Sequence, residues 1–113
     1  MEKFVTVYIT APNQKEAQKI SHLILSEKLA GCINIIPYTE SLYHWEGKIE
    51  NHSEAVLIAK TRKSLVKKLI EFVKNHHSYK VPCITVLPIV DGNKDYFKWL
   101  SKETIRIKRI RRQ

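Results

Sequence analysis

The sequence predicts an α+β fold in which four antiparallel strands form one sheet and helices cover one face of it. Two observations predict this fold. Four segments with strand-like patterning are interleaved with two segments of helical spacing, in the order β-α-β-β-α-β, which is the ferredoxin-like arrangement. The chain also has only 113 residues, enough for one core. A long β-hairpin arm and a short C-terminal helix complete the prediction.

The first strand is predicted by alternating side chains, and the helix after it is predicted by an N-cap residue. Residues 3–10 alternate β-branched and aromatic residues between two faces, which is typical of a strand. Asn13 predicts a helix N-cap with Glu16 as its reciprocal partner, and the helix should run to about Leu29. Gly31 is expected to stop it in a left-handed conformation. The face docked on the sheet should consist of Ala17, Ile20, Leu23, Ile24 and the stem of Lys28.

A long hairpin is predicted in the middle of the chain. The apolar strand over residues 32–36 should end at Pro37, Glu46-Gly47 predicts a tight turn, and residues 51–53 predict a bend or bulge in the returning strand. Without a break, residues 48–60 would reach about 43 Å, beyond the roughly 34 Å diameter of such a domain. The tip should therefore overhang the domain or bend back. An overhanging arm would expose Leu42, Tyr43, Trp45 and Ile49, which predicts self-association.

The second half of the fold should repeat the helix and strand. Apolar spacing predicts a helix from a Thr61 cap to about His77. Residues 80–90 predict the last main strand, and two prolines within it favour a sheet edge or a bulge. Residues 93–102 predict the short third helix.

The end of the chain carries most of the net charge. The sequence has a formal charge of +9, and residues 98–113 contribute seven cations against Glu103 alone, which is +6. We therefore expect one domain over residues 1–103 and a basic tail over residues 104–113. Nucleic acid or an anionic membrane is expected to contact the protein only through this tail, although terminal basic runs are commonly just solvated.

Other classes of protein are disfavoured by what the sequence lacks. It has no long apolar run and no signal-peptide pattern, and Cys32 and Cys83 are too far apart for a zinc ribbon or a disulfide framework. A reducing, cytoplasmic location is expected. No nucleophile elbow, Gly-rich phosphate loop or paired metal-ligand motif is present, so we do not expect an enzyme.

His76 and His77 are the candidate metal ligands, with Cys32 and Cys83 elsewhere in the sequence. Adjacent helical residues point about 100° apart, so two neighbouring imidazoles grip one ion only if the helix ends between them. Other roles stay open: a histidine at a helix C-terminus is stabilised by the carbonyls there, and both cysteines are expected to be small buried hydrophobes.

Taken together, several segments resemble the CutA divalent-ion-tolerance family, and they occur in the family's order over nearly all of residues 4–101. They are residues 9–13 (Ile-Thr-Ala-Pro-Asn), 28–37 (Lys-Leu-Ala-Gly-Cys-Ile-Asn-Ile-Ile-Pro), 41–50 (Ser-Leu-Tyr-His-Trp-Glu-Gly-Lys-Ile-Glu), 57–61, 77–82, 87–89 and 95–100.

The resemblance implies a homotrimer, similar in architecture to the PII signalling proteins, whose hairpins pair across subunits. It also implies weak binding of divalent ions, chiefly copper, with ligands matching His76 and His77. A thiol found before Thr10 in some members is Ile9 here, whereas Cys32 matches another family cysteine. Lys80 and Cys83 replace two family carboxylates, which makes a site there softer.

A second function is also compatible with this architecture. A PII-like trimer can act as a small-molecule sensor or as a scaffold without any physiological metal. Its intersubunit or ligand cleft is expected to involve Tyr43, Trp45, Tyr79, Lys80 and Trp99, and to take an anionic ligand or a partner protein.

Overall fold

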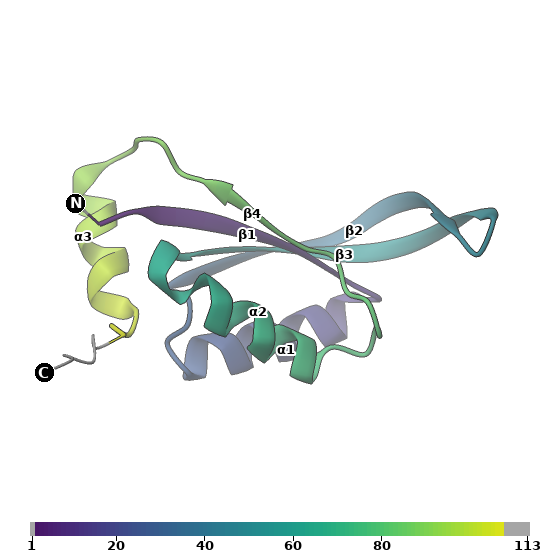
Figure 1. The fold of residues 1–113 in the computed structure, drawn as a ribbon, viewed down its shortest axis with the longest axis horizontal. Coiled ribbons are helices and arrows are strands. Elements are labelled where there is room, and N and C mark those ends of the chain that lie inside the picture. Colours follow the sequence, from purple (N-terminus) through teal and green to yellow (C-terminus); the bar gives the residue numbers. More distant parts are fainter. Residues whose placement is uncertain (1, 108–113) are drawn as a thin grey trace, which may run out of the picture.

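The computed structural model describes residues 2–107. Its strands and helices follow the predicted order, and the α+β fold with a hairpin arm and a C-terminal helix is confirmed (Figure 1). The elements are β1 (Phe4–Ala11), α1 (Gln14–Ser26), β2 (Cys32–Trp45), β3 (Lys48–Arg62), the 3-10 turn η1 (Lys63–Leu65), α2 (Val66–His76), β4 (Ile84–Pro88) and α3 (Lys94–Glu103).

The four strands form one antiparallel sheet in the order β2-β3-β1-β4. Helices α1 and α2 lie on one face of the sheet, and α3 stands at the end away from the hairpin arm (Figure 1). The predicted edge position of the last strand is confirmed, because β4 pairs only with β1 within the described residues. The ladder of β4 is shorter than the predicted strand over residues 80–90.

The core lies between the sheet and its two covering helices. Alternate residues of each strand point toward the helices, as period-two patterning requires. The fully buried side chains of this core include Val7 and Ile9 of β1, Ala17, Ile20 and Ile24 of α1, Leu57 and Ala59 of β3, and Leu65, Leu69 and Val73 of η1 and α2.

The end of α1 differs from the prediction. The helix stops at Ser26, and Lys28, not Gly31, has the left-handed conformation, with φ of 55°. The Lys28 N–H donates to Leu25 O at 3.0 Å and the Leu29 N–H donates to Ile24 O at 3.2 Å, which together form a Schellman motif. Lys28 is therefore exposed and lies outside the docked stripe. Gly31 has a packing role instead, because a Cβ there would lie 2.6 Å from Leu100 Cδ1.

The hairpin arm is longer than predicted and carries its bulge on the other strand. Pro37 does not end β2, which continues to Trp45. The register shifts between Ile36 and Thr39, so two residues of β2 lie opposite Ala55 of β3. Proline is tolerated in such a bulge because its missing N–H interrupts no ladder there. Beyond the ends of β1 and β4 the arm has two strands and overhangs the helices (Figure 1), which confirms the predicted overhang.

Two further details correct the prediction for the second half of the chain. Thr61 does not cap a helix: its hydroxyl donates to Leu29 O at 2.6 Å, and the helical region begins with η1. The start of the predicted tail is packed on the domain, since the Ile105 N–H donates to Lys28 O at 3.0 Å. Residues 108–113 of that tail lie outside the described residues. No helix among the described residues is long and apolar enough to cross a membrane.

Candidate functional site

A groove of about 730 Å³ lies where the hairpin arm leaves the body of the sheet. Its walls come from the arm and from residues 78–83, the segment between α2 and β4. Each wall is held by the neighbouring secondary structure, so the groove is preformed within one chain. The lining residues are Thr10, Ser41, Leu42, Tyr43, Trp45, Glu50, His52, Glu54, Ser78, Tyr79, Lys80, Val81 and Cys83.

The β2 bulge determines which arm residues face the groove. Thr39 is paired with Glu54 on the sheet face that the helices leave uncovered, so the odd-numbered residues after it share that face. Without the extra residue, the alternate set of β2 side chains would lie there. The bulge therefore places Tyr43 and Trp45 on the same face as Glu54.

The wall formed by the arm is aromatic and polar. Tyr43 pairs with Glu50 across the hairpin, and its ring meets the His52 ring edge-on at 5.7 Å between centroids. The His52 Nε2 lies 3.5 Å from the Glu50 carboxylate. A protonated His52 imidazole would therefore form an ion pair with Glu50 at the surface of the arm.

Glu54 is the buried charge of the groove. Its residue is only 8% exposed, and its carboxylate accepts a 2.8 Å hydrogen bond from the Tyr79 hydroxyl. Burial, and secondarily this hydrogen bond, raise the pKa of Tyr79 well above its usual value. Tyr79 therefore stays a proton donor to Glu54. Among the described residues, no Lys, Arg or His nitrogen lies within 4.0 Å of the Glu54 carboxylate.

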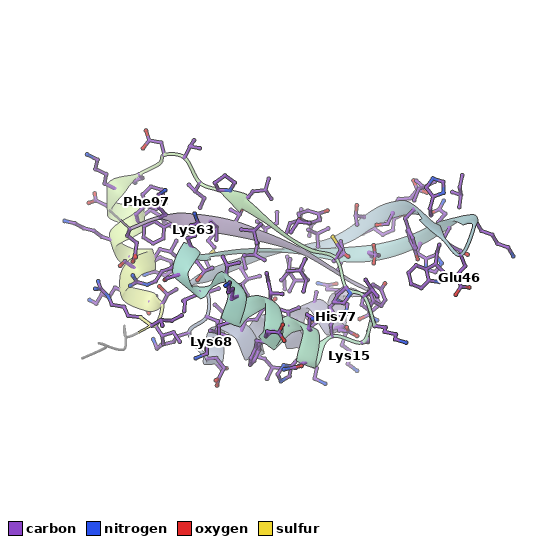
Figure 2. The ribbon with its side chains drawn as sticks, in the orientation of Figure 1. Lys15, Glu46, Lys63, Lys68, His77 and Phe97 are labelled. Atoms are coloured by element: carbon purple, nitrogen blue, oxygen red, sulfur yellow. The ribbon has the colours of Figure 1, made fainter. Side chains whose placement is uncertain are left out.

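His77 fixes the loop that forms the opposite wall. Its side chain is fully buried where α2 ends against the sheet (Figure 2). Nδ1 accepts a hydrogen bond from the Tyr79 N–H at 2.9 Å, so Nε2 carries the proton and donates to Thr10 O at 2.7 Å. The neighbouring Glu16 carboxylate accepts from both the N–H and the hydroxyl of Ser78. Both ring nitrogens of His77 are therefore occupied within the protein.

His76 differs from His77 in exposure and in the availability of its ring nitrogens. It is exposed, its ring stacks on Phe72 at 4.2 Å, and Nδ1 lies 2.7 Å from Phe72 O. Within the described chain, no partner contacts Nε2. The helix ends after His76, as a shared site would require, but the two imidazoles do not present their nitrogens to one ion.

Cys32 lies at the other end of the sheet. It pairs with Lys60, which pairs with Thr6, and Thr6 is four residues, or roughly 13 Å, from Thr10 beside His77. Cys32 is half-buried near Tyr96, whose pKa is raised to about 12 by burial and secondarily by the thiol.

The three predicted metal donors do not converge within one protomer. The described residues contain no cluster of three or more His, Cys, Asp or Glu suited to a metal ion. Cys83 corrects another expectation, since it is exposed rather than buried and lines the groove. The role of His76, His77 and Cys32 as ligands stays a prediction, and a fit to one ion would need donors from another copy or a rearranged His77.

Four of the five predicted cleft residues come together in the groove: Tyr43, Trp45, Tyr79 and Lys80. Trp99 does not join them, because it packs beside Tyr96 at 5.6 Å and close to Gly31, at the opposite end of the sheet. Glu54 was missed by the sequence reasoning. Its only local signal is a lone acid directly before the apolar segment Ala55–Ala59.

Comparison with known proteins identifies the family. The model of the CutA1 divalent ion tolerance protein family matches residues 5–103. The chain is 46% identical over 88% of its length to "Protein CutA, chloroplastic" of Arabidopsis thaliana, and spans 55% of that relative. It is 41% identical over 86% of its length to the divalent-cation tolerance protein CutA of Yersinia pestis, spanning 82% of it.

A solved structure agrees with the sequence comparisons. The crystal structure of CutA1 from Oryza sativa superposes with a TM-score of 0.91 at 45% identity, covering 93% of this chain and 96% of that one. Fold and sequence therefore lead to the same assignment over the whole ferredoxin-like domain. The chain belongs to the CutA1 divalent ion tolerance family.

Proposed function

We propose that this protein is a homotrimer that responds to divalent metal ions, with copper as the leading ion, and that it has no catalytic activity. The observation that carries the proposal is family membership over residues 5–103, since the Yersinia relative is named a divalent-cation tolerance protein. The two unpaired cysteines support a cytoplasmic location, which cell fractionation tests.

Exposed apolar surface on the arm supports assembly. Leu42 is 64% exposed and Ile49 is 71% exposed, on a two-stranded ribbon with unpaired edges. Such edges and side chains are stabilised by pairing with another copy of the chain. Light scattering after gel filtration should give three times 13.2 kDa, about 40 kDa.

A matched pair of variants tests the arm in this assembly. Leu42→Glu together with Ile49→Glu should dissociate the trimer, because charges would be buried in the apolar contact. Leu25→Glu, on the exposed side of α1, should leave the mass unchanged. A monomeric wild-type protein, or a trimer that tolerates the arm substitutions, contradicts the proposal.

Copper binding is supported most directly by His76, because its Nε2 is the available imidazole nitrogen of the adjacent pair. A single exposed imidazole per chain implies weak binding unless another copy adds a donor. Calorimetric titration of copper should give an affinity about tenfold lower in His76→Ala, while the exposed His22→Ala variant serves as control. Equal copper affinity in wild type and His76→Ala refutes this ligand.

A second candidate function is small-molecule sensing or scaffolding, and the preformed groove favours it. Its volume of about 730 Å³ is in the usual range for ligand pockets. A metal-free thermal-shift screen tests this function, since a ligand at a hundred times its dissociation constant adds about 2.7 kcal/mol to the unfolding free energy. The absence of any shift across cationic, neutral and anionic compounds would count against it.

A further inference from the structure

We propose that the groove at the base of the hairpin arm binds an organic cation, an ammonium group on an apolar body, with Glu54 as its counter-ion. The inference names the ligand class of the second candidate function and rests on that function. It is independent of copper binding by His76.

The first argument is the uncompensated charge of Glu54. Glu54 is only 8% exposed as a residue, so its side chain has lost much of its hydration, and an isolated buried charge is costly. Within one protomer, the hydrogen bond to Glu54 comes from the neutral hydroxyl of Tyr79, and no described cation of the same chain pairs with the carboxylate. A positively charged group in the groove would supply the missing partner at hydrogen-bond distance.

The second argument is the nature of the walls. Tyr43, Trp45 and Tyr79 line the same groove as Glu54. Aromatic faces attract ammonium groups through their quadrupoles and also bury apolar surface, whereas they give no comparable attraction to an anion. The groove therefore offers both a charge and a surface that suit an amine with an apolar body.

The third argument is the local charge balance. The charged residues that line the groove are Glu50, Glu54 and Lys80, so the groove has a formal charge of −1 with His52 neutral, inside a chain of +9. This balance favours a cationic ligand over the anionic ligand expected from the sequence. A metal ion fits less well than an amine, because the described residues hold no cluster of three His, Cys, Asp or Glu donors.

The test uses three probes that share one ring and differ in charge: benzylamine, benzyl alcohol and benzoate. Each is titrated into the full-length protein without metal, and binding is followed by NMR shifts of groove amides. Benzylamine should bind at least about tenfold more tightly than benzyl alcohol, and benzoate should bind most weakly.

Two variants assign the effect to Glu54. Glu54→Gln keeps the shape and the Tyr79 hydrogen bond, and should reduce benzylamine affinity about tenfold without changing that of benzyl alcohol. Glu50→Gln removes a partly exposed groove carboxylate, whose attraction to an amine is screened by water, and should change benzylamine affinity less than about threefold.

Several results would overturn the inference. Equal or tighter binding of benzyl alcohol or benzoate overturns the ligand class alone, and so does unchanged benzylamine affinity in Glu54→Gln. If none of the probes binds, as when a side chain of a second copy fills the groove, both the inference and the sensing function fail. If Glu54→Gln does not fold, the relative affinities of the three probes for the wild-type protein still decide whether the groove prefers a cation.

Discussion

His77 is the residue on which the shape of the groove depends most directly. Its buried ring links the end of β1, through Thr10 O, to the start of the groove loop, through the Tyr79 N–H. Tyr79 then reaches Glu54 with its hydroxyl. These three hydrogen bonds connect the end of α2 to β3 through His77 and Tyr79. A substitution at His77 should therefore displace the Tyr79 hydroxyl that donates to the Glu54 carboxylate.

We expect His77→Ala to lower the free energy of unfolding by about 2–4 kcal/mol, because it removes two partly buried hydrogen bonds and leaves a cavity where a fully buried side chain stood. His76→Ala should cost less than about 1 kcal/mol, since that side chain is exposed. Urea unfolding of both variants measures the difference. Equal losses of unfolding free energy in the two variants would mean that the buried contacts of His77 do not stabilise the fold. Copper titrations of a His77 variant can be interpreted only once this stability is known.

Tyr79 predicts a specific dependence of stability on pH. Its pKa is raised in the folded state by burial first and by Glu54 second, so the folded protein holds this proton more tightly than the unfolded chain. The resulting stability is complete below the unfolded pKa near 10 and declines as the pH rises above it. Tyr79→Phe should therefore lose less stability than wild type between about pH 10 and 11.

The same variant also has an effect at neutral pH. Tyr79→Phe should cost about 1–3 kcal/mol at pH 7, because Glu54 loses its hydrogen-bond donor. Urea unfolding at pH 7 and above 10 gives both quantities, and Tyr38→Phe on the exposed face of the arm is the control. Identical pH profiles for Tyr79→Phe and wild type would contradict the assignment of the raised pKa.

At the scale of elements, the arm is the least supported part of the fold. Its two strands pair only with each other beyond β1, and isolated two-stranded ribbons are marginal in water. The turn therefore matters more here than in a buried hairpin. Glu46 and Gly47 both have positive φ, of 50° and 78°, which suits the right-handed twist of a two-residue hairpin.

Gly47→Ala should weaken the arm by about 1 kcal/mol, which corresponds to roughly fivefold faster amide exchange in β2 and β3 near the tip. The cost is conformational, because an added Cβ meets nothing within 4 Å. Glu46→Asn should slow exchange at the same amides, since asparagine tolerates the left-handed region better. Exchange in β1 is the internal control, and an unchanged tip in both variants would contradict this account.

The elements whose signals are local could be predicted from the sequence. Alternation identified β1, the Asn13 cap identified α1, and Glu46-Gly47 identified the turn. The β2 bulge could not be located, because a two-against-one register depends on the partner strand and not on the bulged residues alone. Lys28 was missed for a similar reason: its left-handed conformation is unfavourable by itself, and the Schellman hydrogen bonds stabilise it.

The candidate site was predictable only in part. Tyr43, Trp45, Tyr79 and Lys80 stand in segments that resemble the family, and the groove brings them together. Glu54 becomes significant only when Tyr79, 25 positions later in the chain, is seen to bond it. Burial of a charge is a property of packing, so a charged residue in a strand pattern is expected to be solvated unless its neighbours in space are known.

At the scale of the whole molecule, Arg62 joins both ends of the chain to the sheet. It is 2% exposed, forms an ion pair with Glu2 and donates to Ser101 and to Thr104 Oγ1. Burial, and secondarily the charge of Arg106, lower the pKa of its guanidinium. A buried cation needs such partners, so the residues after α3 belong energetically to the domain.

The contacts of Arg62 divide the basic end of the chain into a packed part and a charged part. Residues 108–113 carry four of its cations, whereas residues 104–107 contribute the packed Thr104 and Ile105. Truncation after Glu103 should therefore lower the free energy of unfolding by about 2–4 kcal/mol more than truncation after Ile107, since only the shorter chain lacks the Arg62–Thr104 bond and the Ile105–Lys28 bond.

The two truncations should differ much less in polyanion binding. Both remove the four cations of residues 108–113, and the shorter chain lacks only Arg106 in addition. The salt dependence of heparin or DNA affinity becomes shallower as the protein neutralises fewer sulfate or phosphate groups, so it should be shallower than wild type in both truncated chains.

Urea unfolding and salt-dependent binding of the two truncated chains measure stability and polyanion affinity separately. Thr104→Val in the intact chain is the control for the Arg62 bond, because it removes the hydroxyl that accepts from Arg62 and keeps every cation. Equal stabilities of the two truncated chains would exclude a structural role for residues 104–107. Undiminished polyanion binding would place that interaction on the body of the domain, where the +4 of residues 1–103 would have to supply it.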